Sequence, residues 1–218
     1  MKQLFSEESI LVRFMSKVGC LIALSFFWLI CSIPLVTIGA SSAALFRSVF
    51  DLREDKDHIL KGFFKAFAAS FKLGTLCWLL VAAAFAVVYC IPRMLVLFPN
   101  NIIITVGVAL TSALMLILWL LLVCLFPMVA YFDNSVQKTM RNAMFVAIKH
   151  RGPSVSSAFL AAVPLILLLV APQIFLVSSG VWCLIYPGVL AYYMVCRFAP
   201  IFLEYGNKRK ERLEQGEE

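Results

Sequence analysis

Long uncharged apolar stretches alternate along the chain with short segments that carry nearly all of its charge. The uncharged stretches cover residues 18–46, 73–91, 102–132, 155–177 and 181–196. A helix that crosses a bilayer needs about 20 mostly apolar residues, so each stretch is a candidate span. The pattern predicts an all-α fold, a polytopic membrane helical bundle with five to six hydrophobic elements.

The first stretch is interrupted by Pro34 and Gly39. Proline removes a backbone donor and crowds the preceding helical turn, and the small residues that follow allow close helix packing in lipid. We expect a helix up to about Pro34, a turn, and a short returning helix from about Gly39 to Asp51. This returning helix is either a short span or a re-entrant leg.

A cleavable signal peptide is the alternative for this region, since Gly39-Ala40-Ser41 faintly resembles a cleavage site. The apolar region is longer than the usual stretch of about 7–15 residues and contains Pro34. These features favour a permanent membrane helix.

The basic residues predict the orientation of the bundle. Lys and Arg number six from Arg47 to Lys72, four from Asp133 to Arg151 and five from Arg197 onward. The 92–101 loop carries only Arg93, and the Ser178–Gly180 turn carries none. Because positive loops stay on the cytoplasmic side, we expect a multi-pass protein of the plasma membrane with both termini in the cytoplasm.

Three segments outside the spans have the apolar periodicity of amphipathic helices. They are the N-terminus, the region that follows residue 58, and the region from about Ser135 to His150. In the third, one predicted face is apolar and comprises Val136, Met140, Ala143, Met144, Ala147 and Ile148. The opposite face contains Lys138, Arg141, Asn142 and Lys149, and its three basic residues are candidates for contact with a partner protein or with anionic lipid headgroups.

The expected organisation is one integral membrane domain over residues 1–218. Each half after residue 58 repeats the same plan, a basic amphipathic helix followed by two spans. The predicted parts are an interfacial helix (1–17), a helix–turn–helix (18–51), an amphipathic helix with two spans (59–132), a second such unit (133–203) and a cytoplasmic tail (204–218).

Composition supports a membrane protein and excludes several other classes. Apolar residues make up 62% of the chain and charged residues 14%, whereas soluble domains have roughly 45–50% and about 25%. The net charge of +7 is explained by orientation and anionic lipid, and not by nucleic acid, because the basic residues flank the apolar stretches. The seven cysteines lie within apolar stretches without C-x-x-C pairs and are interpreted as small buried hydrophobes.

The spans contain no residues that indicate an enzyme, a metal site or a cofactor site. No Asp, Glu, Lys, Arg or His lies within their cores, although proton relays and ion-coupled carriers usually need such groups. His58 and His150 lie in charged segments without ligand spacing. Trp28, Trp78, Trp119 and Trp182, with neutral polar residues, either line a path for an uncharged solute or simply pack the bundle.

Three blocks in this sequence resemble the YesL family, bacterial membrane proteins that carry a domain of unknown function. The first runs from Leu29 to Leu45 and contains the turn residues Pro34, Thr37, Gly39 and Ala40. The second, from Phe63 to Lys72, departs from the family pattern at Ser70 and Leu73, where Asn and Gln are common. The third begins with Phe126-Pro127 and continues through Asn142-Ala143 and Ala147.

The resemblance implies a plasma-membrane protein of Gram-positive bacteria, often encoded near systems that import and degrade carbohydrates. It implies no reaction and no catalytic residue. One hypothesis is an accessory or regulatory component of carbohydrate uptake that contacts a sugar transporter permease or its ATPase. The alternative is a permease-like subunit that passes a neutral solute such as a sugar with a separate cytosolic ATPase, although the Glu-Ala-Ala…Gly loop of importer permeases is missing. A membrane enzyme is the third class, disfavoured by the missing acid–base groups.

Overall fold

The chain folds into helices joined by short turns. The computed structural model describes residues 2–56, 58–95, 101–132 and 134–214, and these contain no strand. Six of the helical segments are long and apolar enough to cross a membrane. The protein is therefore an all-α, polytopic membrane fold, as the apolar stretches predict.

The N-terminal part is a helical hairpin. Helix α1 (Lys2–Ser32) rises to a turn that contains the short 3₁₀ helix η1 (Leu35–Thr37), and α2 (Ile38–Arg53) returns beside it. The turn and the returning helix fall where Pro34 and Gly39 predict them. The expected interfacial helix over 1–17 is not a separate element, because α1 continues through it without a break.

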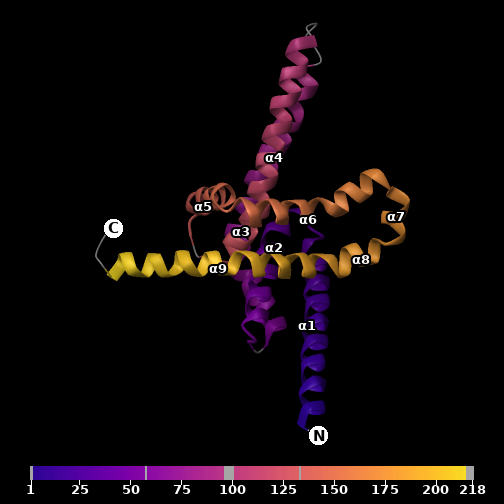
Figure 1. Ribbon diagram of the computed structural model, residues 1–218. Helices are drawn as coiled ribbons and strands as arrows, with labels where there is room; N and C mark the ends of the chain where they lie inside the picture. Colours follow the sequence, from indigo (N-terminus) through magenta and orange to yellow (C-terminus); the bar gives the residue numbers. More distant parts are fainter. Residues whose placement is uncertain (1, 57, 96–100, 133, 215–218) are drawn as a thin grey trace.

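A second hairpin follows, formed by α3 (Ile59–Leu95) and α4 (Asn101–Tyr131). Helix α3 joins the expected amphipathic helix and the expected span into one helix of 37 residues. Its first half lies beside α2, whereas its second half extends away from the rest of the protein together with the first half of α4 (Figure 1). Val87, Met94, Leu110 and Leu116 on this extended part are exposed, as lipid-facing residues are.

The amphipathic helix α5 (Val136–Lys149) precedes a third hairpin of α6 (Arg151–Val170), α7 (Pro172–Val177), α8 (Ser179–Leu184) and α9 (Tyr186–Glu214). The expected span over 155–177 is interrupted before Pro172, where proline cannot continue the preceding helix. Helix α9 continues to Glu214 through the region expected as a tail.

The two later hairpins extend in different directions from a common centre. In Figure 1 the α3–α4 hairpin points upward, whereas α6 and α9 lie across it and join through α7 and α8 at the right. The start of α1, the α2–α3 loop, α5 and the end of α9 lie at the lower and left sides. The segments rich in Lys and Arg are thus grouped opposite the far ends of both hairpins.

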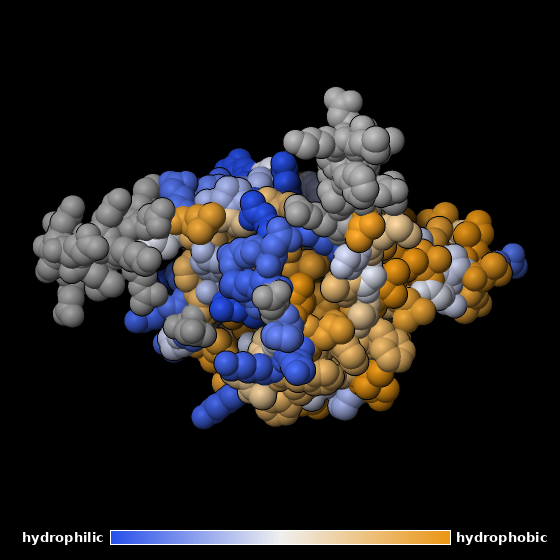
Figure 2. Space-filling model, turned by 90° about the horizontal axis from the view of Figure 1, so that it is seen from below, coloured by the Kyte–Doolittle hydropathy of each residue, from blue (hydrophilic) through white to orange (hydrophobic). Residues whose placement is uncertain are grey.

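The surface shows the same separation of charged and apolar parts. Seen from below, hydrophilic side chains gather around the end that carries the α2–α3 loop, and hydrophobic ones cover the side toward α6–α8 (Figure 2). In this loop Lys56 pairs with Asp51 and Glu54 at 2.8 and 2.7 Å. Its hydrogen bonds to Asp51 and then to Glu54 raise the pKa of its amino group further above neutral pH.

Helix α2 lies at the centre of the core. Its small residues Ala40, Ala43 and Ala44 are fully buried, and Val49 and Phe50 extend the buried surface toward α4 and α9. Small side chains let neighbouring helices approach closely where lipid offers no hydrophobic drive for association. Small residues also join the third hairpin to α1. Ser25 Oγ accepts a hydrogen bond of 2.8 Å from the Gly188 amide in the first turn of α9.

Candidate functional site

The turn between α1 and α2 is a candidate site because it contains the residues that resemble a known family. Ile33 and Leu35 expose about three quarters of their surface, so the turn lies on the outside of the helical bundle. A non-helical turn in hydrocarbon must have its backbone carbonyls satisfied from within the protein. The Thr37 hydroxyl group, a donor, lies 2.6 Å from the Cys31 carbonyl oxygen and 2.7 Å from that of Pro34.

Helix α3 fixes the other side of this turn. The Trp78 indole N–H donates to the Leu35 carbonyl oxygen at 2.9 Å. The Thr37 hydroxyl group thus bonds a carbonyl at the end of α1, and Trp78 bonds a carbonyl of the turn. Two further bonds hold α2 against α1, from Trp28 Nε1 to Ser42 Oγ at 3.1 Å and between Ser32 Oγ and Ser41 Oγ at 2.6 Å.

Gly39 follows the turn at the closest approach of α2 to α3. A Cβ atom built on Gly39 would overlap with the Gly74 carbonyl oxygen and lie 2.6 Å from the Trp78 Cβ atom. Ala40, the next residue of the predicted turn, is fully buried. The predicted turn residues Pro34, Thr37, Gly39 and Ala40 therefore set the backbone and the helix contact here, and they carry no reactive group.

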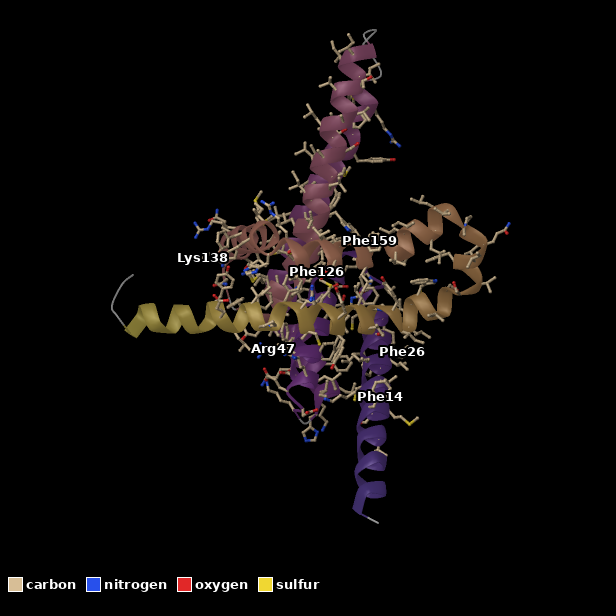
Figure 3. All side chains as sticks on the ribbon, viewed as in Figure 1. Phe14, Phe26, Arg47, Phe126, Lys138 and Phe159 are labelled. Atoms are coloured by element: carbon tan, nitrogen blue, oxygen red, sulfur yellow. The ribbon has the colours of Figure 1, made fainter. Side chains whose placement is uncertain are left out.

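A cavity of about 500 Å³ lies between α1–α4 on one side and α6–α9 on the other. All four tryptophans of the chain line it. Phe126, labelled near the crossing of the hairpins in Figure 3, is also part of its wall. Its volume is within the range of about 300–1,000 Å³ that ligand pockets span.

Five aromatic rings of the wall form two groups on different hairpins. Trp78 and Phe126 lie 6.4 Å apart on α3 and α4. On the third hairpin Phe175 stacks on Trp182 at 6.4 Å, and Trp182 contacts Tyr186 at 5.0 Å. The cavity therefore lies between flat, rigid apolar surfaces.

The indole N–H groups and the tyrosine hydroxyl group of these rings are not free to bind a ligand in the cavity. Besides the indoles of Trp28 and Trp78, Trp119 Nε1 donates to the Ala158 carbonyl oxygen at 3.1 Å and Trp182 Nε1 to Ser178 Oγ at 2.8 Å. The Tyr186 hydroxyl group donates to the Leu160 carbonyl oxygen. Every aromatic donor in the wall is thus already bonded within the protein.

The basic residues predicted as contacts, Lys138, Arg141 and Lys149, lie together on α5 and are exposed. Figure 3 places Lys138 at the left side of the molecule, remote from α7 and α8. They do not approach the cavity, whose wall includes no residue of α5.

The predicted apolar face of α5 is wrong in part. Met144 and Ile148 expose 49% and 59% of their surface, whereas Thr139 and Val146 are buried. The buried strip is rotated because α4 and α6 pack against the side of α5 that carries Thr139. Burial of this threonine is tolerated because its Oγ1 donates to the Ser135 carbonyl oxygen at 3.0 Å. As a result, the basic residues share the exposed surface with Met144, Phe145 and Ile148.

Within the described residues, no group of three or more His, Cys, Asp or Glu side chains is placed to hold a metal ion. His150 instead lies with Nε2 3.2 Å from the Tyr205 hydroxyl oxygen. This contact joins the end of α5 to α9.

The sequence left open whether the four tryptophans line a path or pack the bundle, and the structure brings all four to one cavity. Sequence reasoning missed Gly74, Ser25 and Gly188, whose roles depend on which helices touch. An isolated glycine within a helical pattern was the available signal for Gly74 and Gly188.

The six candidate spans and the apolar cavity define the class, a polytopic integral membrane protein. Residues 21–90 match the model of a family described as "Protein of unknown function, DUF624". The matched segment contains the α1–α2 turn, Gly39, Gly74 and two of the four tryptophans. No curated protein and no solved structure matches the chain significantly.

Proposed function

We propose that this protein is a non-catalytic accessory or regulatory component of a membrane transport system, and that it acts through protein contacts of helix α5. The observation that carries the proposal is the exposed surface of α5, where the basic residues Lys138, Arg141 and Lys149 lie beside the apolar residues Met144, Phe145 and Ile148. Protein interfaces commonly combine an apolar centre with a polar rim. We define these six residues as the α5 surface.

The packing of α5 also supports a docking role. The helix contacts α4 and α6, the adjoining helices of the two hairpins, and buries Thr139, Ala143 and Val146. A partner bound to the outer side of α5 would therefore be connected through this helix to the α3–α4 hairpin and to the hairpin that begins with α6.

Carbohydrate uptake is the proposed system, and the predicted partner is a sugar transporter permease or its ATPase. This part of the proposal depends on the YesL resemblance of the turn, Pro34 to Ala40, and on the cytoplasmic orientation expected from the basic segments. The plasma membrane of a Gram-positive bacterium is the proposed location.

The alternative, a permease-like subunit for a neutral sugar, is less well supported by the cavity. A sugar site needs several polar groups that converge on the hydroxyl groups of the ligand. The indole donors of Trp28, Trp119 and Trp182 are bonded within the protein. Few polar groups of the wall are therefore free to replace the hydrogen bonds that a sugar loses when it leaves water.

Affinity purification in mild detergent tests the proposal. The charge-reversed variant K138E/R141E/K149E is expected to lose the co-purifying permease or ATPase, because like charges and altered solvation disrupt a docked surface. The matched control is K61E/K65E/K72E, which makes the same change in net charge on α3 and should retain the partner.

Three results would contradict the accessory role. The first is a wild-type protein that brings down no transporter subunit, and the second is an α5 variant that retains the subunit fully. Transport of sugar by the purified chain alone in proteoliposomes would replace the accessory role by the permease alternative.

A further inference from the structure

The tryptophan-lined cavity has no role in the proposed function. Its wall includes residues from all six candidate spans. The cavity therefore lies among membrane-spanning helices, where the surrounding medium is hydrocarbon. The occupant must be a molecule that this medium supplies or dissolves.

The chemistry of the wall selects an apolar occupant. The four indole N–H groups and the Tyr186 hydroxyl group donate within the protein. The remaining polar atoms of the wall are Ser42 Oγ, which accepts from Trp28, and the sulfur atoms of Cys183 and Met194. A polar ligand or a cluster of water would forfeit hydrogen bonds here, and this loss is costly in an apolar site.

The pairing of Tyr186 shows how the fold removes a carbonyl that would otherwise attract a polar group. Pro164 lies within α6 and has no N–H, so the Leu160 carbonyl oxygen lacks its helical donor. The Tyr186 hydroxyl group of α9 donates to this oxygen. The carbonyl that Pro164 leaves without a donor is thus satisfied by Tyr186, and both Pro164 and Tyr186 line the cavity.

An empty cavity of about 500 Å³ would deprive its wall of dispersion contacts on one side. We propose that this cavity is a binding site for a lipid acyl chain, held between Trp78 and Phe126 on one hairpin and Phe175 and Trp182 on the other. The acyl chain would fill the space between the two hairpins and contact both of them, independently of any protein contact at α5. The shared chemistry admits two sources, an acyl chain of a bilayer phospholipid and a free fatty acid.

Tryptophan fluorescence reports on this site directly, because the chain has four tryptophans and all of them line the cavity. The protein is reconstituted in phosphatidylcholine vesicles that contain increasing fractions of phosphatidylcholine with brominated acyl chains. Bromine quenches the indole emission at short range. We expect one quenching component that saturates at a low fraction of brominated lipid, beyond the gradual quenching by bulk lipid.

A filling substitution identifies the location of that component. Ala161→Phe places a ring in the wall and is expected to abolish the saturating component. Ala113→Phe is the matched control, since Ala113 lies on the exposed surface of α4 outside the cavity and should leave it unchanged. If A161F does not give a monodisperse protein, the quenching curve of the wild-type protein alone tests the proposal.

A second arm separates the sources. Brominated fatty acid is added to vesicles of unbrominated lipid; saturating quenching in this arm alone assigns a free fatty acid, and quenching by brominated phospholipid assigns a bilayer lipid. Wild-type quenching that is merely proportional to the brominated fraction in both arms would overturn the proposal. A saturating component that A161F and A113F both retain would also overturn it. These results are independent of co-purification through α5, so either proposal can fail alone.

Discussion

Gly39 and Gly74 face each other where α2 approaches α3, and neither position has room for a side chain. A Cβ atom on Gly74 would lie 2.9 Å from the Gly39 carbonyl oxygen and 3.1 Å from the Ala40 Cα atom. The obstacles are backbone atoms, which cannot move aside as a flexible side chain does. This contact holds α2 in the centre of the core and positions the turn that precedes it.

Gly39→Leu should therefore separate α2 from α3 and lower the thermal stability of the protein in detergent. Gly39→Ala should have a smaller effect in the same direction, with a cost of about 1–3 kcal/mol, as is typical of overpacking. The measurement is the midpoint of thermal aggregation or unfolding. Gly62→Ala is the control, because nothing lies within 4 Å of a Cβ atom there and alanine favours the helix. Equal midpoints for G39L and wild type would show that the contact is not required.

Thr37→Val tests whether the α1–α2 turn needs its hydroxyl donor. The substitution keeps the shape and removes the hydroxyl donor to the Cys31 carbonyl oxygen, at an expected cost of about 1–3 kcal/mol for an unsatisfied group in an apolar environment. The Pro34 carbonyl oxygen keeps its bond from the backbone N–H of residue 37. Thr75→Val is the matched change, since Thr75 Oγ1 is buried without a partner and its loss should be neutral or stabilising. The measurement is the thermal midpoint of the two purified variants. A stable T37V beside a destabilised T75V would contradict this explanation.

Tyr186 and Pro164 should be energetically coupled through the Leu160 carbonyl oxygen. Tyr186→Phe removes the hydroxyl donor and is expected to destabilise the protein by about 1 kcal/mol. Pro164→Ala restores a backbone N–H that can bond this carbonyl within α6. A double-mutant cycle should then show a smaller effect of Y186F in the P164A background. Additive effects, with no coupling between the substitutions, would contradict the proposed link between α6 and α9.

The first hairpin shows which parts of the fold the sequence predicts well. Pro34 and the small residues after it predicted the turn and the returning helix, because proline and glycine act locally on the backbone. The ends of α1 and α3 were predicted less well. A charged segment beside a span was expected to be a separate helix, but backbone hydrogen bonding continues through it, and α3 extends from Ile59 to Leu95.

The candidate site depended on information that local patterns lack. The turn residues were found from their sequence, whereas the cavity arises from the crossing of two hairpins that periodicity does not specify. The rotated face of α5 has the same origin. Thr139 is polar by composition and is buried because its hydroxyl group bonds within the helix, and Met144 is exposed because α4 and α6 lie on the other side.

The grouping of the basic segments leads to a prediction of orientation. Lys17 of α1 pairs with Asp55 of the α2–α3 loop at 2.8 Å, so these two segments share one side of the fold. Because basic segments are retained in the cytoplasm, cytoplasmic reporters fused before Met1 and after Glu218 should both be active, and a reporter inserted after Asn100 should be active only if it functions outside. Helix α2 must then cross back after α1, although most of its surface is buried by protein and not by lipid. An N-terminal reporter that reads as extracellular would mean that α1 and α2 do not form a returning pair in the membrane, and the cytoplasmic position proposed for α5 would have to be established separately.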